Sequence, residues 1–325
     1  MDIVVTGSIA YDYLMRFPGS FRQHILTDAL HQVSLSFLVD DMTKHWGGVA
    51  ANIAFSMAQL GLRPRLFGTV GRDFADYRHW LESAGVDCSL VRQHDDVFTA
   101  SFFCNTDNEN NQIASFYTGA MAYSRYYSLS AAISGRFTPD LVVISPNDPQ
   151  AMSNYAEECR QHGWRFVYDP SQQIARMDGE SLRRDMCGAH IMVINEYESI
   201  LIRDKTGLTL TELINAVDIL IVTHGKNGSR IHADGQVIEV PIFETDQLRD
   251  PTGAGDAYRA GFLAAYSYGL PLRICGEVGT LCAAYVLEQV GTQNHRHTIS
   301  DFIARYREQF NDQGLLDVML KPQKA

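Results

Sequence analysis

The chain has 325 residues, 46% of them hydrophobic, which is enough for one large α/β domain or two smaller domains with a sizeable buried core. Its formal net charge of −11 argues against broad binding to nucleic acid or to anionic membranes, so a phosphate site would have to be local. The cysteines are scattered without a C-x-x-C pair, and the sequence contains neither a signal-peptide pattern nor an apolar run of about 18 residues. We therefore expect a soluble, cytoplasmic protein without a zinc knuckle or a disulfide framework.

The first predicted element is a buried strand of the parallel type around Ile3-Val4-Val5. Its carboxyl end delivers Ser8 and then Asp12 to a crevice. A carboxylate in that place can accept hydrogen bonds from two neighbouring hydroxyl groups. A solvated acid in a turn explains Asp12 equally well.

Two regions alternate hydrophobic and polar residues with a period close to two, His31 to Trp46 and Val97 to Tyr117. The second is interrupted by a polar turn at residues 105–111, which predicts a hairpin. Together they predict a small antiparallel sheet inserted into the α/β chain. Its aromatic residues exceed what one thin sheet can bury alone, so a ligand or a partner's sheet would cover them. These residues are Phe37, Phe102, Phe103, Phe116 and Tyr117.

A helix is predicted between the two inserts, after Gly47-Gly48. The glycines leave the first turn of this helix bare, and Asn52 lies one turn inside it. A tight turn that permits close packing is the alternative explanation of the glycine pair. The next predicted elements are a strand at residues 65–70 and an amphipathic helix that runs through Trp80-Leu81.

From Asp140 onward, apolar runs without alternation predict the strands of a parallel sheet that is covered on both faces. These runs are Leu141 to Ile144, Phe166 to Tyr168, Ile191 to Ile194 and Ile219 to Val222. Polar segments follow several of them and face the same crevice. Because no linker divides the chain, we expect one large domain (residues 1–12, 46–95 and 119–325) that carries a lid (residues 13–45 and 96–118). His295 and His297 are expected in a solvated loop rather than at a metal.

The segment from Asp250 to Phe262 combines a bare helix start with a carboxylate. Small residues recur at helical spacing after Asp256, and Thr252-Gly253-Ala254-Gly255 leaves the first N–H groups uncovered. Free N–H groups and the positive end of the helix dipole favour an anion. With Asp256 as a base, this arrangement suits transfer of a phosphoryl group to a hydroxyl. An ordinary glycine-rich turn with an acid in the first helical turn is the alternative.

Three elements together resemble the ribokinase-like (phosphofructokinase-B) family of carbohydrate and nucleoside kinases. They are Gly47-Gly48 with Asn52, Asn195-x-x-Glu198, and Asp250 to Asp256, with Pro251 where threonine is commoner. The resemblance implies an α/β fold with a mostly parallel central sheet, flanking helices and a small antiparallel β lid.

Further segments are similar to the bacterial adenosine kinases of the mycobacterial type, apart from small departures at Ala51 and Tyr258. These segments are residues 7–12, 14–19, 33–41, 113–117 and 169–173.

The resemblance also implies roles for individual residues. Asp256 would be the base for the ribose 5′-hydroxyl, and the N–H groups of Gly253, Ala254 and Gly255 would stabilise the transferring group. The remaining residues of the acceptor pocket are Ser8, Asp12, Ser36, Gly48, Asn52, Phe102, Phe116, Gln172, Gln173 and Arg176. Thr223 and Gly225 would contact ATP, and Asn195 and Glu198 would arrange the water around Mg²⁺.

The implied activity is that of an adenosine kinase, which uses Mg²⁺ and ATP to phosphorylate the 5′-hydroxyl of adenosine and gives AMP and ADP. Stacking of a base on Phe102 is worth about 1–3 kcal/mol, which favours a nucleoside over a bare sugar. A kinase for guanosine, inosine or a sugar is the alternative. A non-catalytic binding protein would be expected to have lost Asp256 or the glycines, all of which are present. A homodimer formed through the lids is expected, with no nucleic-acid or membrane partner.

Overall fold

The computed structural model describes residues 1–24 and 34–321. These residues form an eight-stranded sheet with the order β14-β13-β12-β11-β10-β9-β1-β4. The strands from β12 to β4 are parallel, whereas β13 and β14 are antiparallel to their neighbours. In chain order the strands are β1 (Ile3–Thr6), β4 (Arg65–Phe67), β9 (Leu141–Ile144), β10 (Phe166–Tyr168), β11 (Ile191–Asn195), β12 (Ile219–Thr223), β13 (Ser229–Ala233) and β14 (Gln236–Val240).

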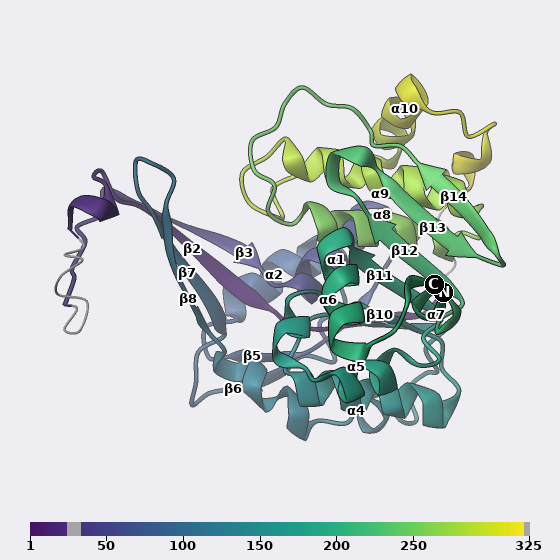
Figure 1. The fold of residues 1–325 in the computed structure, drawn as a ribbon, viewed down its shortest axis with the longest axis horizontal. Helices are drawn as coiled ribbons and strands as arrows, with labels where there is room; N and C mark the ends of the chain where they lie inside the picture. The colour runs from purple at the N-terminus through teal and green to yellow at the C-terminus, as the bar shows by residue number, and fades with distance from the viewer. Residues whose placement is uncertain (25–33, 322–325) are drawn as a thin grey trace.

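Helices cover both faces of this sheet (Figure 1). Successive side chains of a strand point to opposite faces, so Ile3 and Val5 lie in one core cluster and Val4 in the other. The first cluster takes apolar residues from α1 (Val49–Gln59), α2 (Ala75–Ser83), α8 (Ala254–Ser267), α9 (Leu272–Leu287) and α10 (Ile299–Gln309). The second takes them from α3 (Leu129–Ile133), α4 (Pro149–His162), α5 (Gly179–Met186), α6 (Glu196–Thr206) and α7 (Leu210–Asn215).

A second, four-stranded sheet projects from the body as a lid, with the order β3-β2-β7-β8 (Figure 1). Its strands are β2 (Ala10–Arg16), β3 (Asp41–Gly47), β7 (Ala100–Thr106) and β8 (Gln112–Tyr117). The expectation of a wholly antiparallel lid is wrong, because β2 and β7 run parallel, while β2–β3 and β7–β8 are antiparallel. The remaining strands form a two-stranded parallel pair, β5 (Thr69–Gly71) with β6 (Arg92–His94). The described part also contains the 3₁₀ helices η1 (Phe21–Gln23), η3 (Gly119–Tyr126), η4 (Ser171–Arg176), η5 (Gly225–Asn227) and η6 (Leu315–Leu320).

The predicted strands of the parallel sheet agree with the observed ones to within one residue. The run at residues 65–70 forms two strands, β4 and β5, rather than one. The alternating segment that begins at His31 is a strand only from Asp41 onward; residues 31–33 lie outside the described part, and residues 34–40 form no ladder. Phe37 packs instead against Phe17 and Phe21, with ring centroids 5.0 and 4.8 Å away.

The expectation of a solvated loop at His295 and His297 is also wrong. His295 is 3% exposed and its Nε2 lies 3.3 Å from Ser56 Oγ of α1. Burial lowers the pKa of His295 to about 3 and that of His297 to about 4, so both rings are neutral. Neutral histidines pack like other aromatic rings, and His297 contacts Tyr285 and Phe302.

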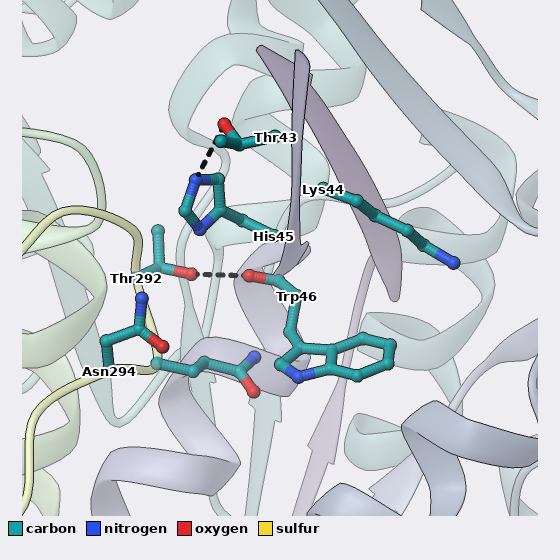
Figure 2. Close-up of a pocket in the computed structure, with 7 residues that line it drawn as sticks. Thr43, Lys44, His45, Trp46, Thr292 and Asn294 are labelled. Carbon is teal, nitrogen blue, oxygen red and sulfur yellow. Dashed lines mark hydrogen bonds between the residues drawn. The ribbon is translucent and has the colours of Figure 1, made fainter. Parts of the chain in front are cut away.

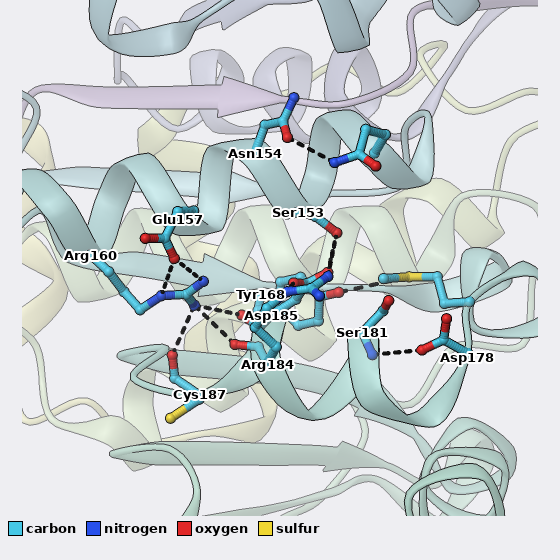
Figure 3. A network of polar contacts seen from close by, with 12 residues as sticks. Ser153, Asn154, Glu157, Arg160, Tyr168, Asp178, Ser181, Arg184, Asp185 and Cys187 are labelled. Atoms are coloured by element: carbon cyan, nitrogen blue, oxygen red, sulfur yellow. Dashed lines mark hydrogen bonds and ion pairs between the residues drawn. The ribbon is translucent and has the colours of Figure 1, made fainter.

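On the far side of the sheet, a polar network ties α4 to the end of α5 (Figure 3). The Arg160 guanidinium donates to the carbonyl oxygens of Arg184 (3.0 Å) and Cys187 (3.2 Å), which lie at the carboxyl end of α5. The last carbonyls of a helix lack intrahelical partners, so Arg160 satisfies groups that would otherwise need water. This network fixes the helical layer beneath the sheet, away from the cavities described next.

Candidate active site

A cavity of about 670 Å³ lies between the lid and the carboxyl ends of the parallel strands. It brings together most of the residues that the sequence predicts for an acceptor pocket. Those that line it are Ser8, Asp12, Gly48, Asn52, Phe102, Phe116, Gln172, Gln173, Arg176, Gly253 and Asp256. The lining also includes Thr118, Met121, Pro146 and Thr292, which the sequence analysis did not identify.

The register of the lid sheet explains how Asp12, Phe102 and Phe116 meet. Asp12 of β2 lies beside Phe102 of β7, and Phe102 lies opposite Phe116 of β8. Residues in one such row point to the same face of a sheet. One carboxylate and two aromatic rings therefore face the cavity side by side, and Phe116 is 48% exposed there.

Asp12 sits in an electrostatically unfavourable place. Burial is the main cause that raises its pKa, with the negative charges of Asp256 and Asp250 as further causes. Together they raise the pKa of Asp12 to about 6. Asp12 belongs to strand β2 and lines the larger cavity, so it is not a solvated acid in a turn.

The start of α1 is fastened to the end of β1. The Ser8 hydroxyl accepts a hydrogen bond from Val49 N (3.0 Å), and Ser8 O accepts one from Ala50 N (3.1 Å). Gly48 adopts φ +91°, and a Cβ there would stand 2.5 Å from Ala10 N. Close packing of the backbone therefore requires glycine at this position, and the same geometry exposes Gly48 to the cavity.

The start of α8 is organised by Asp250. Its carboxylate accepts hydrogen bonds from Thr252 N (2.9 Å) and from Gly291 N (3.1 Å), which ties the loop before α8 to the loop after α9. Gly253 caps the helix in the left-handed conformation, with φ +81°. The N–H of Ala254 donates a long bond to Pro251 O (3.3 Å), so this group is partly engaged rather than bare.

Asp256, in the first turn of α8, is hydrogen-bonded to Asn52 of α1. Asn52 Nδ2 donates to Asp256 Oδ2 at 2.8 Å. Burial raises the pKa of Asp256, whereas the Arg259 charge and the Asn52 hydrogen bond oppose that rise. A carboxylate with a raised pKa in a cavity fits the role of a proton acceptor.

Arg259 lies one turn beyond Asp256 and forms a buried ion pair with Asp169. The side chains are 9% and 0% exposed, and Arg259 Nη2 donates to Asp169 Oδ1 at 2.8 Å. Burial raises the pKa of Asp169, and the Arg259 charge opposes this rise. This pair was not predicted from the sequence, because Arg259 lies on the helix face opposite the small residues, where a solvated cation is the ordinary expectation.

A second, mainly apolar cavity of about 420 Å³ lies on the other side of the loop before α8. Thr223 and Gly225 line it, as do Ala254 and Gly255 at the start of α8. Its apolar wall comes from Ile242, Phe243, Leu248, Ala283 and Leu287. The start of α8 therefore borders both cavities, with Asp256 on the side of the larger one.

Three predicted residues line neither cavity. Asn195 and Glu198 form a capping box at the start of α6, in which Asn195 Oδ1 accepts from Glu198 N and Glu198 Oε2 accepts from Asn195 N, each at 2.8 Å. Glu198 Oε1 also accepts from the Ser171 hydroxyl (3.2 Å). Ser36 is exposed in the segment before β3.

Behind the larger cavity, a polar groove runs between β3 and the loop at residues 292–294 (Figure 2). The Thr292 hydroxyl lies 2.9 Å from Trp46 O, and His45 Nε2 lies 3.1 Å from Thr43 Oγ1. Thr292 borders both the groove and the larger cavity, so this loop separates the two.

A model of the pfkB family of carbohydrate kinases matches residues 3–299. The chain belongs to the pfkB carbohydrate kinase family. A nucleoside kinase of Methanothermobacter thermautotrophicus is 31% identical, over 95% of this chain and 96% of that protein. The structure of a Burkholderia thailandensis nucleoside kinase in complex with ADP-inosine is similar, with a TM-score of 0.82 and 35% identity over 95% of this chain and 96% of that one.

The nucleoside kinase of Methanocaldococcus jannaschii, described as an archaeal member of the ribokinase family, gives a TM-score of 0.84 at 28% identity, over 95% of this chain and 98% of that one. These likenesses confirm the predicted ribokinase-like α/β fold, with a mostly parallel sheet and flanking helices. Within residues 1–24 and 34–321, no helix is long and apolar enough to cross a membrane. The same residues contain no cluster of three or more histidine, cysteine or acidic side chains suited to a metal ion.

Proposed function

We propose that this protein is an ATP-dependent nucleoside kinase that phosphorylates the 5′-hydroxyl of adenosine and releases AMP and ADP. The observation that carries the proposal is the position of Asp256. It lies at the start of α8, shares the larger cavity with Asp12, and belongs to a helix whose first residues also line the apolar cavity. An acceptor on one side and a phosphoryl donor on the other can meet only at this helix start.

In the proposed reaction, adenosine occupies the larger cavity. Asp12, the Gly48 backbone and Asn52 bind the 2′- and 3′-hydroxyls, because a carboxylate and a backbone turn can engage neighbouring hydroxyls together. Phe102 and Phe116 supply apolar faces for the base, with Gln172, Gln173 and Arg176 at the same wall. The exposure of the Phe116 ring toward the cavity supports this arrangement.

Asp256 takes the proton of the 5′-hydroxyl as its oxygen attacks the terminal phosphorus of ATP. A bond forms between that oxygen and phosphorus, and the bond from phosphorus to the bridging oxygen of ADP breaks. The backbone N–H groups of Gly253, Ala254 and Gly255 stabilise the negative charge on the transferring group. Thr223 and Gly225 line the apolar cavity, which would hold the rest of ATP.

The magnesium ion that accompanies ATP would be bound by Asn195 and Glu198 through water. Both oxygens of the Glu198 carboxylate already accept hydrogen bonds, from Asn195 N and from Ser171 Oγ, which fits an indirect role better than direct coordination. Asn195 and Glu198 contribute only a carboxylate and an amide, which suits an ion that keeps most of its water ligands. When bound, the ion would neutralise negative charge on the phosphates.

Inosine is the second candidate acceptor, because the similar Burkholderia kinase was solved with ADP-inosine. Gln173 is 6% exposed, lines the larger cavity, and its Oε1 has no hydrogen-bond partner among the described residues. Such an acceptor suits the 6-amino group of adenine and the N1–H of hypoxanthine alike. This acceptor therefore suits a nucleobase that presents an N–H group, and adenosine is the proposed substrate among such nucleosides.

The lid also supports a homodimer. The face of the lid opposite the cavity carries Met42, Phe103, Ile113 and Tyr117, which are 59%, 38%, 43% and 44% exposed. Contiguous exposed apolar side chains of this kind mark an interaction surface. A second copy of the same sheet is the proposed partner, and light scattering on the purified protein tests it.

A coupled assay across adenosine, inosine, guanosine, ribose and fructose 6-phosphate tests the proposed acceptor. We expect the largest kcat/KM for adenosine, and a higher value for ribose or fructose 6-phosphate than for every nucleoside would refute the proposal.

Asp256→Asn should lower kcat at least about a hundredfold while adenosine binding stays nearly intact, because only the base is lost. Near-normal turnover of this variant would remove Asp256 from the role of base.

A further inference from the structure

The hydrogen bond between Asn52 and Asp256 depends on which end of the Asn52 amide faces the carboxylate. With the amide turned around, its carbonyl oxygen would face Asp256, and two acceptors would repel each other. The direction of this side chain therefore decides whether Asp256 receives a stabilising donor. The groups that fix the direction of the Asn52 amide lie on α2 and in the loop after α9. None of them was predicted from the sequence as a site residue.

The Gln293 side chain makes three hydrogen bonds in the buried layer behind Asn52. Its Nε2 donates to Asn52 Oδ1 (2.9 Å) and to the Tyr77 hydroxyl (2.6 Å), and its Oε1 accepts from Trp80 Nε1 (3.1 Å). The Gln293 side chain is enclosed, with 1% of the residue exposed. It is therefore held at both ends of its amide.

The indole N–H of Trp80 sets the direction of the whole series, because an indole nitrogen donates and never accepts. Gln293 must turn its oxygen to Trp80, so its nitrogen faces Asn52. Asn52 must then turn its oxygen to Gln293, so its nitrogen faces Asp256. Trp80 itself is fixed by stacking on Phe55, with ring centroids 6.0 Å apart and planes within 2°.

Thr292 does not replace Gln293 in this role. Its hydroxyl lies 2.8 Å from Asn52 Oδ1 and 2.9 Å from Trp46 O, the second contact being drawn in Figure 2. One hydroxyl has a single proton for these two acceptors. Gln293 is the group that always presents an N–H to Asn52.

We propose that Gln293, held by Trp80 and Tyr77, is a positioning residue that directs the Asn52 N–H toward Asp256. The inference rests on the proposed function, in which Asp256 is the base. Loss of the Asn52 donor removes a hydrogen bond to the ionised carboxylate, and a carboxylate that loses such a bond keeps its proton to higher pH. The effect on turnover should therefore depend on pH.

Gln293→Met is the sharpest test, because methionine keeps the length of the side chain, adds no charge near Asp256 and offers no N–H to Asn52. We expect the acid limb of the kcat profile to move up by about one pH unit, so that kcat falls about tenfold on the acid limb and recovers toward the wild-type value at alkaline pH. Trp80→Phe, which removes the directing donor and keeps a ring, should move the limb in the same direction.

Ser56→Ala is the matched control, since Ser56 is one turn beyond Asn52 on α1 and also bonds the loop after α9, through His295, without joining the series. It should leave the acid limb unchanged. The other charged groups that face Asp256, namely Arg259 on α8, Asp12 on β2 and Asp169 after β10, are the same in all these variants.

A loss of kcat that is equal at every pH in Gln293→Met and Trp80→Phe would overturn the inference, as would the same shift in Ser56→Ala. If Asp256→Asn is inactive and the acid limb of Gln293→Met does not move, only this inference fails. If Asp256→Asn stays active, the assignment of the base fails first, and the positioning role falls with it.

Discussion

Replacing Asp12 with asparagine tests whether the site holds a carboxylate at a cost in stability. The change keeps the shape of the side chain and removes its charge. In the wild-type protein, burial and the charges of Asp256 and Asp250 raise the pKa of Asp12 from 3.8 to about 6. Each pKa unit corresponds to about 1.4 kcal/mol, so the ionised Asp12 lowers the free energy of unfolding by at most about 3 kcal/mol at pH 8.

The sign of the pH dependence of stability follows from how many protons the folded and unfolded states bind. Between about pH 4 and pH 6, the folded protein keeps a proton on Asp12 that the unfolded chain has released, so this group makes the fold more stable as the pH falls from 6 to 4. Activity should change in the opposite direction, because only the ionised form accepts two ribose hydroxyls. We expect kcat/KM to fall about tenfold per pH unit below pH 6, since this parameter reports the free enzyme.

Urea unfolding at pH 8 and pH 5 measures the stability term. We expect Asp12→Asn to be more stable than wild type at pH 8 by up to about 3 kcal/mol, with the difference shrinking toward pH 4, while kcat/KM for adenosine drops at least about a hundredfold at pH 8. Glu308→Gln removes an equal charge from an exposed position on α10 and should change stability by less than about 0.5 kcal/mol. If Asp12→Asn were no more stable than wild type at pH 8, the reasoning from burial and charge would be wrong.

Two further substitutions test the aromatic wall and the buried ion pair. Phe102→Ala should weaken adenosine binding by about 1–3 kcal/mol and raise KM with little change in kcat; an unchanged KM for adenosine would rule out the stacking role. Arg259→Met should lower the free energy of unfolding by about 3–5 kcal/mol, because it leaves the Asp169 charge buried without a partner. The double variant Arg259→Met/Asp169→Leu should recover most of that loss in urea unfolding, and a single variant as stable as wild type would contradict the burial of the pair.

The strands of the central sheet could be predicted because each is an uninterrupted apolar run that packs on both faces. The pairing in the lid could not, since the parallel contact of β2 with β7 joins segments about 90 residues apart and no local pattern encodes the partner. The segment before β3 alternates like a strand, yet Phe37 finds its partners in Phe17 and Phe21 rather than in a ladder. Local periodicity indicates which side chains are buried, but it does not indicate which other residues pack against them.

The residues of the candidate site also differ in whether a local pattern could predict them. Asp12, Asn52 and Asp256 could be predicted because each follows a strand end or begins a helix, where the backbone geometry dictates what a side chain can do. Gln293 gave no such signal, because its role depends on contacts with α1 and α2 that only the folded chain creates. Residues that touch a ligand carry motifs, whereas residues that orient them are recognisable only from the hydrogen bonds that they complete.

The carboxylates of this cavity show why the site destabilises the fold that carries it. Burial raises the pKa values of Asp12 and Asp256, so each is harder to ionise in the folded protein than in the unfolded chain. The Arg259 charge opposes this effect at Asp256. The positive end of α8 also favours an ionised carboxylate in its first turn. The proposed acceptor, which donates hydroxyl protons to Asp12 and Asp256, would relieve the remainder. A bound acceptor should therefore stabilise the protein most at neutral and alkaline pH, where the empty site repels itself most strongly.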